Sequence, residues 1–180
     1  MKEQFLEELK DEIQKGVSKK GHPFRYTTMA SVVDNTPQTR TVVLRRVSTD
    51  FDLFIYTDER SDKISQIIKN NKVSFLFYHP KKLVQIRIDG LAHIITDKAE
   101  LKKYWSGIPP NSRADYTTIT APGSTFKNPD NVTYLEDEHH FCILKIIPTT
   151  MEYLKLKRPN HIRIKFEKND GNWEGSFLVP

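Results

Sequence analysis

Two hydrophobic periodicities organise the chain. Near its beginning, Phe5, Leu6, Leu9 and Ile13 recur at intervals of three or four within residues 2–15. This spacing predicts an amphipathic helix, inside an N-terminal helical segment that we place at residues 1–20. Further along, apolar and polar residues tend to alternate, which predicts β-strands. We expect strands at residues 24–33, 38–47, 52–57, 73–78, 83–95, 141–147, 151–156, 161–166 and 173–178.

The remaining helices are predicted to be short. One begins at Ser61, another covers residues 97–105, and a third follows the prolines at 109–110. Residues 117–137 are irregular and contain scattered Gly and Pro, which is typical of a lid or a binding loop. Many strands with few short helices predict a mainly β fold, an antiparallel sheet that closes into a β-barrel. We expect one domain over residues 1–180.

Composition bears on the compartment in which the protein is expected. The chain has 180 residues, 37% of them hydrophobic, and this suffices for a substantial core. No apolar run approaches the ~20 residues that span a bilayer, and the charged N-terminal stretch is unlike a secretory signal. The only cysteine, Cys142, lies in an apolar strand, so we interpret it as a core residue. These features predict a cytoplasmic protein without a membrane partner.

Charge concentrates toward the end of the chain. The formal net charge is +5, and residues 155–168 carry six lysines and arginines. Such a stretch suits nucleic acid, an acidic surface or a phosphorylated small molecule, or it forms a solvated strand face. The stretch lacks the interleaved aromatic residues that nucleic-acid binders favour, so we expect no nucleic-acid partner.

A candidate anion site lies where the third predicted strand meets the next helix. Ser61 is a good N-cap, and the N-terminus of a helix carries unpaired N–H groups with a partial positive charge. Arg60 and Lys63 flank it, which favours a phosphate group at this position. The alternative is a capped helix with solvated cations.

Two strands carry polar groups on defined faces. Arg40, Val42, Leu44 and Arg46 share one face of strand 38–47, which indicates either ligand binding or charge protection of an edge strand. In strand 83–95, Gln85 shares a face with neighbouring charged residues. Its amide offers a donor and an acceptor for the edge of a heteroaromatic ring, unless the face simply meets water.

Several motifs are missing from the sequence. It contains no GxGxxG, GxxxxGK[ST], HExxH or CxxC. His139 and His140 are adjacent on a strand and point to opposite faces, which argues against a shared metal. We therefore expect no metal, and we expect any catalysis to come from a bound organic cofactor that the protein positions.

Several short motifs occur in a fixed order along the chain. They are RTVVLR (40–45), YT (56–57), S-x-K (61–63), VQIRIDG (84–90), YW with PP and S (104–112), HIR (161–163) and the closing W with L-x-P (173–180). This ordered set resembles the pyridoxamine 5′-phosphate oxidase family of FMN-binding split β-barrels, from about residue 24 to the C-terminus. The resemblance implies a split β-barrel, FMN at the interface of a homodimer, and an FMN-dependent oxidoreductase.

The resemblance carries over a set of cofactor-binding residues. It implies that Arg40, Lys63 and Ser61 hold the FMN phosphate, with Arg60 in place of the family arginine that Asp62 replaces. Tyr153 falls where the family has a flavin-contacting tryptophan. The other implied cofactor contacts are Thr41, Val42, Val43, Arg45, Tyr56, Thr57, Gln85 and Arg163.

The substrate side departs further from the family. The resemblance implies Arg45, Tyr104, Ser112 and His161 as substrate-binding residues, with His161 and Tyr104 closest to the chemistry. Ile108 and Pro159 each replace a family arginine, and losing such a bidentate clamp usually costs a few kcal/mol. We therefore expect an altered substrate site and inefficient oxidation of pyridoxamine 5′-phosphate.

Other readings remain open from the sequence. One is a true pyridoxamine or pyridoxine 5′-phosphate oxidase that makes pyridoxal 5′-phosphate. Another is a flavin- or haem-binding stress protein without turnover, and a third is a nucleic-acid binder that uses residues 155–168. The N-terminal helix could also cover the apolar strands and leave a monomer in place of a homodimer.

Overall fold

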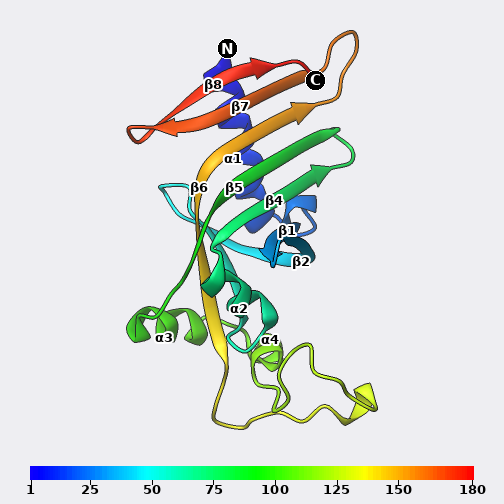
Figure 1. Cartoon of the computed structure of the whole chain (residues 1–180), viewed down its shortest axis with the longest axis vertical. Helices are drawn as coiled ribbons and strands as arrows, with labels where there is room; N and C mark the ends of the chain where they lie inside the picture. The colour runs from blue at the N-terminus through cyan, green and yellow to red at the C-terminus, as the bar shows by residue number, and fades with distance from the viewer.

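The computed structural model describes residues 1–180 and is built mainly of strands (Figure 1). The strands are β1 (Tyr26–Val33), β2 (Thr36–Val47), β3 (Leu53–Asp58), β4 (Lys72–His79), β5 (Val84–Ile94), β6 (Phe141–Lys155), β7 (Ile162–Asn169) and β8 (Asn172–Leu178). The helices are α1 (Lys2–Ser18), α2 (Asp62–Lys69), α3 (Lys98–Ser106) and α4 (Pro110–Arg113), with short 3-10 turns η1 (Pro23–Arg25), η2 (Ala114–Tyr116) and η3 (Pro129–Asn131).

The strands form one antiparallel sheet that closes on itself. Their order is β3-β2-β1-β4-β5-β6-β7-β8, and β3 also pairs with β6. This extra pairing closes strands β1 to β6 into a barrel, and β7 and β8 extend the sheet beyond it. The prediction of a mainly β, split-barrel fold is therefore confirmed.

The barrel is filled by the apolar residues that alternate along its strands. Phe75, Phe77, Ile86 and Ile88 are fully buried. Helix α1 lies across one face of the sheet, behind β5 to β8 in Figure 1, and buries Leu9 and Ile13 completely. Its apolar stripe thus joins the same core as the strands, as the helical periodicity predicts.

Cys142 belongs to this core, as predicted. It is 4% exposed, and burial raises the pKa of its thiol to about 11. The thiol therefore stays un-ionised at neutral pH and is a poor nucleophile.

One predicted boundary was wrong, because the two strands predicted at 141–147 and 151–156 form the single strand β6 (Phe141–Lys155). Pro148 lies opposite Gly90, where the register shifts between Asp89 and Gly90. A Cβ on Gly90 would lie 2.5 Å from the carbonyl oxygen of Ile147, so glycine allows the two backbones to approach. The bulge accommodates a proline that would otherwise end the strand.

Helices α2 to α4 and the 117–137 loop gather at one end of the molecule, opposite the chain termini (Figure 1). The loop contains η3 and an isolated bridge between Thr118 and Tyr134. No helix has the length and apolar character needed to cross a membrane.

Candidate functional site

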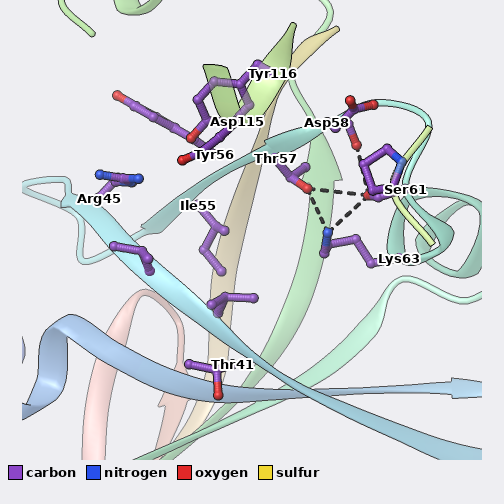
Figure 2. Close-up of a pocket in the computed structure, with 13 residues that line it drawn as sticks. Thr41, Arg45, Ile55, Tyr56, Thr57, Asp58, Ser61, Lys63, Asp115 and Tyr116 are labelled. Atoms are coloured by element: carbon purple, nitrogen blue, oxygen red, sulfur yellow. Dashed lines mark hydrogen bonds between the residues drawn. The ribbon is translucent and has the colours of Figure 1, made fainter. Parts of the chain in front are cut away.

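A pocket of about 250 Å³ opens between β2, β3, the start of α2 and η2 (Figure 2). Eight of the residues that sequence reasoning assigned to the cofactor line it. They are Thr41, Val42, Val43, Arg45, Tyr56, Thr57, Ser61 and Lys63. Ile55, Asp58, Asp115, Tyr116 and Pro122 complete the wall.

One side of the pocket is a candidate anion site built around Lys63. Its Nζ donates hydrogen bonds to Thr57 Oγ1 at 2.7 Å and to Ser61 Oγ at 3.0 Å (Figure 2). Ser61 is the N-cap residue of α2, so the positive end of the helix dipole faces the same space. Burial, and then the nearby charge of Arg40, lower the pKa of Lys63. A bound phosphate would relieve both effects, because it returns a negative charge to the ammonium group.

Arg40 lies behind this site and does not line the pocket. Its guanidinium donates to Ser31 Oγ at 2.6 Å and to Gln66 Oε1 at 2.7 Å. The prediction of direct phosphate contact by Arg40 is therefore not supported by its orientation. Its charge still acts on the site through Lys63.

Arg60 also has partners of its own. It pairs with Asp58 at 2.7 Å and donates to the carbonyl oxygens of Thr118 at 2.7 Å and Ile119 at 2.9 Å. The prediction that it replaces a phosphate-binding arginine is not supported, because its donors hold the start of the 117–137 loop. Sequence reasoning missed this because the partners are 58 and 59 residues away.

The other side of the pocket holds a second cation, Arg45. Its guanidinium lies 5.9 Å from the ring centre of Tyr56, and its Nε is buried without a hydrogen-bond partner. Burial raises the pKa of both Tyr56 and Tyr116, so their hydroxyls stay protonated and can donate hydrogen bonds. An unpaired buried guanidinium nitrogen beside two phenols favours a polar or anionic ligand group.

The 117–137 loop contributes to this region, as its irregularity suggested. A second cavity of about 350 Å³ adjoins the pocket, and both are lined by Asp115 and Pro122. The loop therefore forms part of the ligand-binding end of the molecule.

Several predicted substrate residues lie beside the pocket and do not line it. The Tyr104 hydroxyl accepts a hydrogen bond from Arg46. Ser112 is half-buried on α4. Ile108 is buried in a small apolar cluster with Phe54 and Phe141. The residue in place of the family arginine is thus a packing residue with no polar group to offer.

The remaining predicted ring contacts lie on the far part of the sheet. One row of paired residues crosses five strands and consists of Tyr78, Gln85, Leu154, Arg163 and Leu178. Arg163 pairs with Leu154 on β6, whereas Thr57 in the pocket pairs with Cys142, twelve residues away on the same strand. At ~3.3 Å per residue, this separation is roughly 40 Å along β6. His161 is exposed at the β6–β7 turn, where its Nδ1 accepts a hydrogen bond from the backbone of Lys157.

Tyr153 does not face this row. It is fully buried beneath α1, and its hydroxyl donates to Glu8 Oε1 at 2.8 Å. Burial and the Glu8 carboxylate raise the pKa of Tyr153. The predicted cofactor contact is therefore not supported, and Leu154, one residue on, occupies the outward position between Gln85 and Arg163. Strict alternation along β6 was the signal that could have found Leu154.

A split barrel with a candidate anion site where β3 meets α2 fits the class of FMN-binding domains. The chain belongs to the pyridoxamine 5′-phosphate oxidase family, whose model, described as "Pyridoxamine 5'-phosphate oxidase, FMN-binding domain", matches residues 2–96.

Curated relatives carry a related name. Pyridoxine/pyridoxamine 5′-phosphate oxidase of Pelagibacter ubique is 27% identical over 163 residues, covering 82% of this chain and 77% of the relative. The protein of the same name from Cupriavidus metallidurans is 28% identical over 169 residues, covering 85% and 78%.

Two solved structures share the fold over nearly the whole chain. A pyridoxamine 5′-phosphate oxidase-related, FMN-binding protein of Nostoc punctiforme superposes with a TM-score of 0.79 at 23% identity, covering 97% of this chain and 96% of that one. PhzG of Burkholderia lata, solved with tetrahydrophenazine-1-carboxylic acid, has a TM-score of 0.79 at 17% identity, covering 98% and 91%.

Proposed function

We propose that this protein is an FMN-dependent oxidoreductase that acts on a small molecule. The observation that carries the proposal is the Lys63–Thr57–Ser61 cluster, which faces the pocket with a partly buried ammonium group that has no carboxylate ion pair. These donors would hold the FMN phosphate. Thr41, Val42 and Val43 on β2 would lie along the flavin. Bound FMN would supply hydride transfer, and the protein would orient it and its substrate.

We further propose that the working form is a homodimer. Gln85 and Arg163 both align with Leu154, far along β6 from Cys142, which pairs with Thr57 beside Lys63. A flavin bound at Lys63 would therefore contact Gln85 and Arg163 only if a second copy of the chain supplied them. The outward sheet face also exposes Leu76 at 41% and Tyr78 at 48%. Apolar side chains gathered on one sheet face favour burial against a partner.

The substrate is proposed to differ from pyridoxamine 5′-phosphate. Ile108 is buried among apolar residues and Pro159 has no cationic group, so two guanidinium groups of the family pattern are missing. Arg45 remains as the free cation of the pocket, with Tyr56 and Tyr116 beside it. We infer a substrate with a single anionic or strongly polar group, with Tyr104 and His161 nearest to the chemistry.

A second candidate is a true pyridoxine/pyridoxamine 5′-phosphate oxidase. It is favoured by the name of the curated relatives, which align over most of this chain. Formation of pyridoxal 5′-phosphate with release of hydrogen peroxide would establish this activity.

The proposal of FMN binding is tested by titrating the flavin-free protein with FMN and with riboflavin. We expect tight FMN binding and much weaker riboflavin binding, because riboflavin lacks the phosphate. Equal affinities would contradict the phosphate site, and the absence of any binding would contradict the flavin function.

We also propose that residues 1–180 act as one domain in the cytoplasm. The main core runs from Leu6 on α1 to Phe166 on β7, so the helix and the barrel share it. The single, buried cysteine suits a reducing compartment.

A further inference from the structure

A buried carboxylate lies in the middle of the outward sheet face. Glu152 is on β6 and is 6% exposed, although its neighbour Tyr153 is the residue that faces α1. Burying a carboxylate is costly unless charged partners compensate it. Its partners therefore indicate why the strand keeps a glutamate at this position.

Two arginines share this carboxylate. Arg163 donates from its Nε to Glu152 Oε1 at 3.0 Å, and Arg87 donates to Oε2 at 3.2 Å. Arg87 also pairs with Asp89 at 3.4 Å, so the four side chains balance in charge. Glu152 on β6 thus accepts hydrogen bonds from Arg87 on the neighbouring strand β5 and from Arg163 on the neighbouring strand β7.

The hydrogen bond from Nε to Glu152 leaves the other nitrogens of the Arg163 guanidinium unpaired. The two terminal nitrogens of its guanidinium have no partner within the chain, and a third of the side chain is exposed. An arginine on a flexible stem loses up to ~2 kcal/mol of rotamer entropy when it is ordered by a ligand. Fixing the Nε beforehand removes part of that cost and leaves the terminal N–H groups available to a ligand.

We propose that Glu152 is a positioning residue that holds Arg163 for contact with the flavin ring. The inference rests on the proposed function, in which Arg163 is a ring contact. Fixed N–H donors stabilise the more negatively charged, reduced state of a flavin. Holding Arg163 in place therefore raises the reduction potential of the bound FMN.

The sign of a potential shift distinguishes positioning from simple charge. If Glu152 acted only through its charge, its removal would raise the FMN potential, because a negative group would leave the site. If it positions Arg163, its removal lowers the potential, because the donors become mobile. Glu152→Gln retains an acceptor for Nε, so it should not lower the potential.

The experiment compares the midpoint potential and the affinity of FMN in wild type, Glu152→Ala, Glu152→Asp, Glu152→Gln and Arg163→Ala. We expect the Ala and Asp variants at 152 to shift the potential downward, as Arg163→Ala does. A tenfold loss of preference for reduced over oxidised FMN corresponds to about 30 mV. The double variant E152A/R163A should be no lower than R163A, since the two residues act as a unit.

Glu152→Asp keeps the charge and shortens the reach, so it remains informative if the alanine variant fails to fold. Lys165→Gln, on the same face of β7, serves as the charge control and should change the potential little. An unchanged or raised potential in both E152A and E152D, with R163A lowered, overturns this inference alone. No effect of R163A on affinity or potential overturns both the ring-contact assignment and this inference.

Discussion

At the scale of single residues, Lys63 is the side chain on which cofactor binding should depend most. Lys63→Ala removes the partly buried ammonium group that faces Thr57 and Ser61. A hydrogen bond to a charged group contributes about 1.5–3 kcal/mol, so we expect FMN affinity to fall roughly 10- to 100-fold. Riboflavin affinity should change little, because the lost contact is to the phosphate. Flavin-fluorescence titration measures both.

Lys69 provides the matched control for this prediction. It lies in the last turn of the same helix, is exposed, and should leave FMN affinity unchanged when replaced by alanine. Equal losses in the two variants would point to general electrostatics and would contradict a specific phosphate contact.

Replacing Arg60 tests whether this residue holds the 117–137 loop or contacts the FMN phosphate directly. Arg60→Gln should loosen the 117–137 loop, because the carbonyl oxygens of Thr118 and Ile119 lose their donors. Hydrogen exchange should increase in this segment, while FMN affinity falls less than in Lys63→Ala. Lys127→Gln, an exposed change in the same loop, should not alter exchange. An Arg60→Gln loss of FMN as large as that of Lys63→Ala would restore direct phosphate contact by Arg60.

At the scale of elements, α1 is fastened to the barrel by a buried carboxylate. Glu12 is 2% exposed and accepts hydrogen bonds from Lys82 at 2.6 Å and Lys15 at 3.0 Å. Burial raises the pKa of Glu12, but the hydrogen bonds from Lys82 and Lys15 outweigh it and lower the pKa to about 2. The contact therefore links the helix to the β4–β5 turn in a pH-dependent way.

The sign of this pH dependence follows from the lowered pKa. The contribution of Glu12 to stability is complete above its unfolded value of 4.5 and is lost as the pH falls toward about 2. Glu12→Gln should lower the free energy of unfolding by about 1–3 kcal/mol at pH 6. The difference from wild type should shrink at pH 3 in urea unfolding followed by circular dichroism.

The exposed Glu7 is the matched control on the same helix. Its contact with Lys10 is 3.5 Å long and lies at the surface, so Glu7→Gln should change stability by only a few tenths of a kcal/mol. A Glu12→Gln penalty that stays constant from pH 6 to pH 3 would rule out the proposed linkage.

At the scale of the whole molecule, the outward sheet face should join two copies of the chain. Tyr78 is 48% exposed and pairs across the strands with Gln85. Tyr78→Glu places a charge on this face and should shift the protein from dimer to monomer in sedimentation analysis. FMN affinity should fall with it, because one chain lacks part of the site.

Ile68 offers a control, since it is 72% exposed on α2 and lies outside this face. Ile68→Asp should leave the dimer intact. A monomeric wild type that binds FMN tightly would contradict the shared site.

The comparison of sequence with structure separates local from distant information. The alternation in β2 and β5, the stripe on α1 and the buried Cys142 were all predictable, because each depends on which residues are apolar within a short window. The residues around Lys63 were also found, since Thr57, Ser61 and Lys63 are neighbours in the chain. A resemblance to the family supplied the cofactor, which no local pattern does.

The type of fold, the apolar core and the clustering of Thr57, Ser61 and Lys63 at the start of α2 follow from the order of residues alone. The tertiary structure decided the rest. Folding brings together residues that are apart in the sequence, as in the pairs Arg60 with Thr118, Arg40 with Gln66 and Glu152 with Arg163. The face of the sheet on which a side chain lies also depends on the register of its strand, because a shift of one residue moves the side chain to the opposite face. That is why Tyr153 is buried beneath α1 and Leu154 lies on the outward face.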